Sequence, residues 1–125
     1  MMNLYTRFVL LITIVSFLSG CSHQRGENDI IELSYEQNQT VTYEQAIDLY
    51  EKLDKAFRSA RLMEVGKTDA GKPLHLFVIS SDGDFNPASV RKKGKRVMLI
   101  NNGVHPGEPC GIDASLQFAN DILLN

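Results

Sequence analysis

The segment RVMLIN, at residues 96–101, places four apolar side chains in succession between charged and polar neighbours. Successive side chains of a strand point to opposite faces of a sheet, so Val97 to Ile100 cannot all face one apolar layer. A strand of this kind is buried on both faces, as in the middle of a sheet. The segment therefore predicts an α/β fold in which other elements cover both sides of residues 96–101.

One amphipathic helix and a hairpin are predicted earlier in the chain. Residues 42–60 carry apolar side chains at three- and four-residue spacing, and Thr42 with Gln45 forms a candidate capping box. Residues 62–65 and 74–80 predict two strands, which the turn sequence TDAGK joins into an antiparallel hairpin. The buried stripe of the helix is predicted to be Ala46, Leu49, Tyr50, Leu53, Ala56, Phe57 and Ala60.

A second helix is predicted after the apolar segment. Residues 81–95 form a polar connection, and residues 109–124 have helical periodicity with Pro109 as the first helical residue. The order is therefore helix, three strands and helix, which makes an incomplete sheet because no element remains to flank residues 96–101. The predicted buried stripe of the second helix is Ile112, Leu116, Ala119 and Leu123.

The N-terminus has the pattern of an export signal. Residues 1–7 carry one positive charge and residues 8–18 are almost wholly apolar, a run too short to predict a membrane-spanning helix. The sequence LSGC that follows resembles the lipobox of bacterial lipoproteins, in which the cysteine, here Cys21, is lipidated. Residues 1–20 are then a lipoprotein signal peptide, and the protein is exported and membrane-anchored, facing the periplasm or the cell exterior. The alternative is a plain cleaved signal in which Cys21 is incidental.

Residues 21–40 are polar and are predicted to form a tether, part of which, DIIEL, could pack as an irregular arm.

The net charge of −2 indicates no nucleic-acid partner. The basic run RKKGKR, residues 91–96, favours a solvated turn that leads into a strand, with a contact to anionic lipid headgroups as the alternative. Cys110 is the remaining thiol, so no disulfide is expected.

The stretch HPGE places His105 and Glu108 between the last predicted strand and the second helix. An imidazole nitrogen and a carboxylate oxygen are both ligands for zinc. Gly107 lets the backbone bend so that both side chains can turn toward one point, and Gly103 leaves the approach uncrowded. Taken alone, the spacing also fits a hydrogen-bonding histidine and a glutamate that caps a helix.

A longer pattern contains this stretch. The turn GKTDAGK, residues 66–72, has the form G-x-(S/T)-x-x-G-(K/R), and it is followed by a strand, an apolar strand, NNGVHPGEPCGIDAS and a helix. This order resembles the M14 zinc carboxypeptidase family, in its H-P-G-E-P form, over residues 42–125. Residues 41–125 are thus expected to be the N-terminal portion of a zinc-carboxypeptidase-like domain, with a mixed sheet flanked by helices.

The resemblance implies a zinc metallocarboxypeptidase that releases C-terminal residues from peptides. His105 and Glu108 match the first two ligands of its single Zn²⁺ ion, whereas the third histidine, the general-base glutamate and the substrate-binding arginines are expected beyond Asn125. Neither His23, in the tether, nor His75, in a strand, is expected to replace the missing ligand. We therefore expect this chain alone to bind zinc weakly, if at all, and to be inactive.

Two other functions fit parts of the sequence. The chain could be a non-catalytic, lipid-anchored binding domain with a decayed metal site, or an α/β domain in which His105 and Glu108 are structural.

Cys110 is predicted to be a small residue under the start of the helix, with a sulfur ligand as the alternative. Asp113 is predicted to stabilise the helix dipole, and Asn101 and Asn102 to hydrogen-bond backbone near the site.

Overall fold

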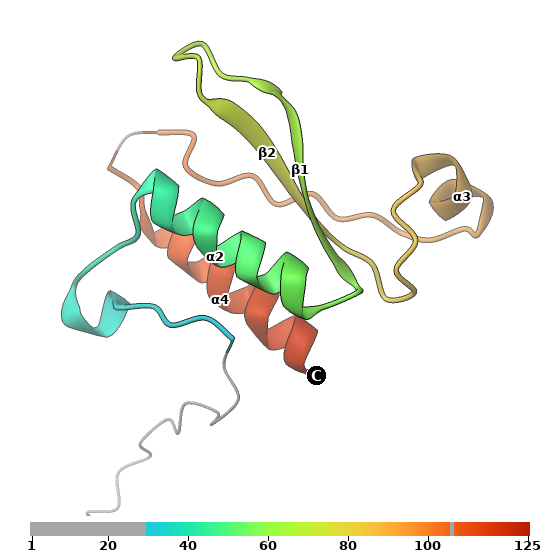
Figure 1. Cartoon of the computed structure of the whole chain (residues 1–125), viewed down its shortest axis with the longest axis horizontal. Coiled ribbons are helices and arrows are strands. Elements are labelled where there is room, and N and C mark those ends of the chain that lie inside the picture. Colours follow the sequence, from blue (N-terminus) through green and yellow to red (C-terminus); the bar gives the residue numbers. More distant parts are fainter. Residues whose placement is uncertain (1–29, 106) are drawn as a thin grey trace, which may run out of the picture.

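A computed structural model of the chain describes residues 30–105 and 107–125. Helices α2 and α4 lie side by side, and the β1–β2 hairpin packs against α2 (Figure 1). The fold is therefore of mixed α and β type, as expected. In chain order the elements are η1 (Tyr35–Gln37), α2 (Tyr43–Ala56), β1 (Ala60–Lys67), β2 (Pro73–Ile79), α3 (Pro87–Lys92) and α4 (Cys110–Leu124).

The capping box predicted for the first helix is present. The backbone N–H of Gln45 donates to Thr42 Oγ1 over 3.2 Å, and that of Thr42 donates to Gln45 Oε1 over 2.8 Å. The helix ends at Ala56, earlier than predicted, because Phe57 is already extended, with φ −127° and ψ 125°. Ala60 is buried as predicted but is the first residue of β1, so the apolar periodicity continued across the boundary between two elements.

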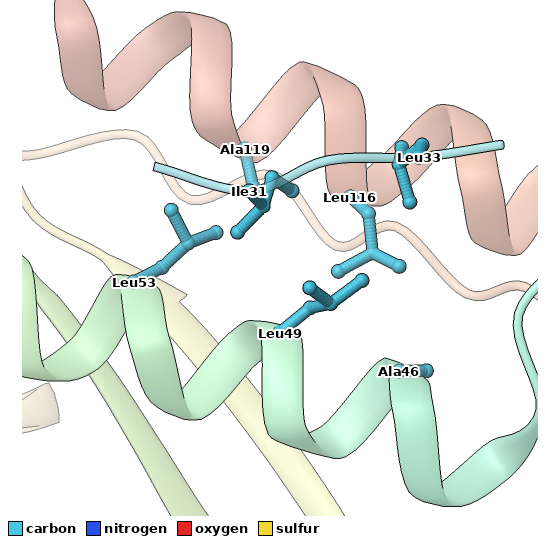
Figure 2. Close-up of a cluster of buried hydrophobic side chains, with 7 residues drawn as sticks. All are labelled: Ile31, Leu33, Ala46, Leu49, Leu53, Leu116 and Ala119. Carbon is cyan, nitrogen blue, oxygen red and sulfur yellow. The ribbon is translucent and has the colours of Figure 1, made fainter. Parts of the chain in front are cut away.

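The core lies between α2 and α4 and is closed by the segment that precedes α2 (Figure 2). Ile31 and Leu33 are 5% and 2% exposed, so the described part of the arm DIIEL is packed against the helices. Residues 21–29, including Cys21, lie outside the described residues. Burying an aliphatic side chain stabilises a fold by about 1.5–3 kcal/mol. The buried cluster consists of Ile31, Leu33, Ala46, Leu49, Leu53, Leu116 and Ala119.

The antiparallel hairpin is confirmed, with β1 longer than predicted and β2 shifted by one residue. Ala60 pairs with Ile79 at one end and Lys67 with Pro73 at the other, with an irregularity in β1 between Glu64 and Gly66. The ring of Phe77 in β2 lies 4.6 Å from that of Tyr50 in α2, centroid to centroid, so aromatic packing holds the hairpin on the helix. Desolvation at this contact raises the pKa of Tyr50.

The connection after β2 contains a short helix that was not predicted, α3. Asn86 caps it by accepting hydrogen bonds from the backbone N–H groups of Ala88 and Ser89, at 2.9 and 3.2 Å. The cap precedes Pro87, which suits a first helical residue. This Asn-Pro pair was a local signal for a helix start inside a segment predicted to be a loop.

Part of the basic run forms ion pairs in this connection, although most of its residues are exposed to solvent, as predicted. Lys93 donates to Asp82 over 3.0 Å and to Asp84 over 2.6 Å, and Lys95 pairs with Asp82. The hydrogen bond from Lys93 lowers the pKa of Asp84 to about 2, and those from Lys95 and Lys93 lower the pKa of Asp82. Arg91 and Lys92 form the end of α3, so residues 91–96 are not a simple turn leading into a strand.

The prediction of a third strand at residues 96–101 is wrong. These residues have no regular secondary structure, and the sheet has two strands in the part of the chain that the structure describes. Val97 is 81% and Leu99 78% exposed, opposite to the two-sided burial that was expected. A strand exists only when a second backbone accepts and donates its hydrogen bonds, and no described backbone lies in register with this segment.

Helix α4 begins at Cys110, with Pro109 at the position before it rather than as its first residue. Leu116 and Ala119 are buried, as predicted, and Ile112 and Leu123 pack partly buried against the same cluster. One prediction at its start is wrong, because Cys110 is exposed rather than covered by the helix. Asp113 lies in the first turn, as predicted, and is also buried.

The reason for the burial of Asp113 is a long-range contact. One of its carboxylate oxygens accepts a hydrogen bond from the backbone N–H of Val41 over 3.3 Å, so it holds the segment before α2 as well as facing the start of its own helix. Of the helices described, none is long and apolar enough to cross a bilayer.

The α2–α4 contact yields a stability prediction. Leu116 is fully buried, so Leu116→Ala should lower the free energy of unfolding by about 2–5 kcal/mol, through lost burial and the cavity left behind. Leu76→Ala serves as the control, because Leu76 is 39% exposed on the hairpin and should cost less than about 1 kcal/mol. Urea unfolding followed by circular dichroism measures both values. Equal losses in the two variants would contradict the proposed core.

Candidate metal centre

The two residues expected to bind zinc lie together at the entry to α4. His105 precedes the helix by a short loop, and Glu108 is separated from Cys110, the first helical residue, by Pro109 alone. His105 Nδ1 lies 3.2 Å from a carboxylate oxygen of Glu108. The side chains are 73% and 65% exposed, so solvent or a ligand can reach both.

Two glycines give the loop the shape that this approach requires. Gly107, between the two ligands, has φ +85°, which a residue with a side chain rarely adopts. Gly103, at the start of the loop, has φ +67°, and a Cβ added there would lie 3.1 Å from Ile112 Cδ1 in α4. Gly107 thus provides the bend predicted between His105 and Glu108, whereas Gly103, predicted to leave the approach uncrowded, lies close to α4.

The distance between the two side chains fits a shared cation. Two ligands bound about 2.0–2.1 Å from one tetrahedral zinc ion lie about 3.3–3.4 Å apart. The observed separation of 3.2 Å between His105 and Glu108 is close to this value, and one nitrogen with one carboxylate is a donor set that zinc accepts. The same contact is also a hydrogen bond when Nδ1 carries a proton.

No third ligand joins this pair among residues 30–105 and 107–125, where no group of three histidine, cysteine or acidic residues could hold a metal. His75 lies in β2, the strand in which it was predicted, with Nδ1 3.4 Å from the hydroxyl of Tyr43. His23, in the predicted tether, lies outside the described residues. Among the described residues the structure therefore brings together only the two predicted ligands, His105 and Glu108, and a four-coordinate zinc site would need more.

Asn102 connects the loop to α4 through a contact that the sequence did not predict. Its side-chain amide donates to the hydroxyl of Ser115, rather than bonding to backbone near the site as was expected. Gly111 lies beneath the same amide, where an added Cβ would be 2.9 Å from Asn102 Oδ1. The glycine in the first turn of the helix was the only sequence signal for this close approach.

Comparison with known proteins identifies one family. A family model described as zinc carboxypeptidase, peptidase M14, matches residues 46–125, from the first turn of α2 to the last residue. The match includes both His105 and Glu108. Neither a curated protein nor a solved structure matches the chain.

The backbone shape at Gly103 can be tested independently of metal. Gly103→Ala should lower the free energy of unfolding by about 1–3 kcal/mol, because alanine is strained at φ +67° and its Cβ would crowd Ile112. The control is Gly66→Ala, at a position without positive φ and with no atom within 4 Å of an added Cβ, where we expect a change within about 0.5 kcal/mol. Urea unfolding of both variants provides the comparison. A neutral Gly103→Ala would show that the loop does not need this conformation.

Proposed function

This chain belongs to the zinc carboxypeptidase family, and we propose that it supplies two of the zinc ligands, His105 and Glu108, of a metallocarboxypeptidase that releases C-terminal residues from peptides. The observation that carries the proposal is the convergence of the two side chains to 3.2 Å at the start of α4. The family match supports the reaction class, and the geometry supports the choice of ligands.

The chemistry required of these residues is modest. His105 would offer an imidazole nitrogen and Glu108 a carboxylate oxygen to one cation, with the carboxylate also neutralising part of its charge. Zinc, when bound, lowers the pKa of a water molecule and polarises the scissile carbonyl. Exposure of both side chains leaves the remaining coordination positions open to other ligands and to substrate.

Peptide hydrolysis requires groups beyond this pair. A catalytic zinc site has three protein ligands and an open position, and its reaction also needs a general base and a group that binds the terminal carboxylate of the peptide. We propose that residues beyond Asn125, in a longer form of the protein, supply these groups. The 125-residue chain by itself is accordingly proposed to bind zinc but to have no peptidase activity.

Zinc binding is the direct test of the proposed ligands. Isothermal titration calorimetry at about pH 7.5 should give a dissociation constant for Zn²⁺ on the order of 10–100 µM. This affinity is much weaker than that of a structural zinc site with four protein ligands. His105→Gln and Glu108→Gln should each weaken binding at least about tenfold. His75→Gln is the matched control, because it removes the other described histidine and should leave the affinity unchanged.

Two results would contradict the proposal. Unchanged affinity in His105→Gln and Glu108→Gln would show that the ion binds elsewhere, and a wild-type chain without measurable binding would show that this pair alone does not hold zinc. Neither ligand variant should change stability by more than about 0.5 kcal/mol, because both side chains are exposed. A loss of affinity at constant stability therefore reports on the metal site rather than on folding.

We further propose that the protein is a lipoprotein anchored through Cys21 in a bacterial membrane, outside the cytoplasm. The LSGC sequence after an apolar segment supports this location. Ile31, docked in the core, follows Cys21 by ten residues, which can span at most about 33–36 Å. An anchor at Cys21 would hold the zinc ligands near the membrane surface, where peptides at the cell envelope could reach them.

Cys21→Ser tests the anchor. In a bacterial expression host, wild-type protein should partition into the membrane fraction and incorporate labelled palmitate, and Cys21→Ser should lose the label. Cys110→Ser, which alters the other cysteine, should keep both properties. Equal labelling of wild type and Cys21→Ser would overturn the proposed lipidation.

A further inference from the structure

We propose that Asn102, held by Ser115, is a positioning residue that sets the separation of His105 and Glu108. This inference rests on the proposed zinc ligands and adds a residue that does not touch the metal. Asn102 is three residues before His105, and its partner is in the second turn of the helix that follows Glu108. The contact therefore ties together the two ends of the loop that carries both ligands.

The side chain of Asn102 is a part of the loop that contacts α4. The side-chain amide of Asn102 donates to Ser115 Oγ, while its carbonyl oxygen occupies the space where a residue larger than glycine at position 111 would place a Cβ, 2.9 Å away. The amide is thus bonded to α4 at Ser115, and the absence of a side chain at Gly111 leaves room for it. Next to it, Gly103 approaches Ile112 closely enough that an added Cβ would be 3.1 Å from its Cδ1.

The ligands have little else to hold them. Residues 96–105 make no backbone hydrogen bond to any other described residue, and the side chains of His105 and Glu108 are 73% and 65% exposed. Packing therefore does not fix their positions. The position of His105 depends on how its backbone is attached to the helix, and the position of Glu108 depends on the start of that helix.

A small displacement of a metal ligand strongly lowers the affinity for the metal. Partners that orient metal ligands without binding the metal typically contribute about 10–100-fold to metal affinity. Loss of the Asn102–Ser115 bond would let the His105 side of the loop move away from α4. We therefore expect the bond to change zinc affinity more than it changes the stability of the fold.

The experiment compares four substitutions in the full chain. Ser115→Ala removes the acceptor, and Asn102→Leu removes the donor while retaining similar volume, so that each end of the contact is tested by its own variant. Ser115→Thr keeps the hydroxyl, so this variant should retain the contact with Asn102. Gln117→Ala is the matched control, because it deletes another side-chain hydrogen bond of α4, from Gln117 to Asp121 at 2.7 Å, that does not involve the loop.

Two measurements are made on each variant. Calorimetric titration with Zn²⁺ should show about tenfold weaker binding in Ser115→Ala and Asn102→Leu, and binding within about twofold of wild type in Ser115→Thr and Gln117→Ala. Without metal, ¹⁵N relaxation should show increased motion of the backbone amides of residues 103–105 and 107–108 in the first two variants only. Urea unfolding should place Ser115→Ala and Gln117→Ala within about 0.5 kcal/mol of each other.

The outcomes separate this inference from the proposed function. Unchanged amide dynamics in Ser115→Ala and Asn102→Leu would overturn the positioning role, as would equal weakening of zinc binding in Gln117→Ala. If His105→Gln does not affect zinc binding, the proposed function fails. In that case, increased loop motion in Ser115→Ala that is restored in Ser115→Thr still supports the attachment of the loop by Asn102.

Discussion

The apolar contact between α2 and α4 is the interaction on which the rest of the structure depends. Leu53 from one helix and Leu116 from the other are fully buried, and Ile31 and Leu33 close the groove between them. Each wholly buried leucine contributes about 1.5–3 kcal/mol, a large share of the stability of a small domain. The start of α4, and with it Glu108 and the attachment of Asn102, is positioned by this contact.

Polar contacts fix two further segments of the chain against α4. Asp113 is buried because it binds the backbone of Val41, which fixes the segment entering α2 relative to α4. Asn102 is held by Ser115, two residues further along the same helix. The first two turns of α4 therefore serve both the core and the candidate metal centre, since one helix carries the contacts of both.

The exposed segment at residues 96–101 shows the limit of the sequence pattern. Four apolar side chains in succession predict burial, but in the described structure Val97, Met98 and Leu99 are exposed. Burial requires partners on two faces and paired backbone on two edges, and both are properties of the surroundings rather than of the segment.

Local sequence was sufficient for α2 with its capping box, for the hairpin and for most of α4, and it placed His105 and Glu108, whose side chains meet, three residues apart. These features depend on contacts between residues a few positions apart, which periodicity, turn residues and a spacing of three report directly. The burial of Asp113 against Val41 and the Asn102–Ser115 contact could not be obtained in this way. They arise from residues that are distant in sequence and meet only after the helices have packed, so the folded arrangement alone decides which polar groups are paired and which apolar groups are covered.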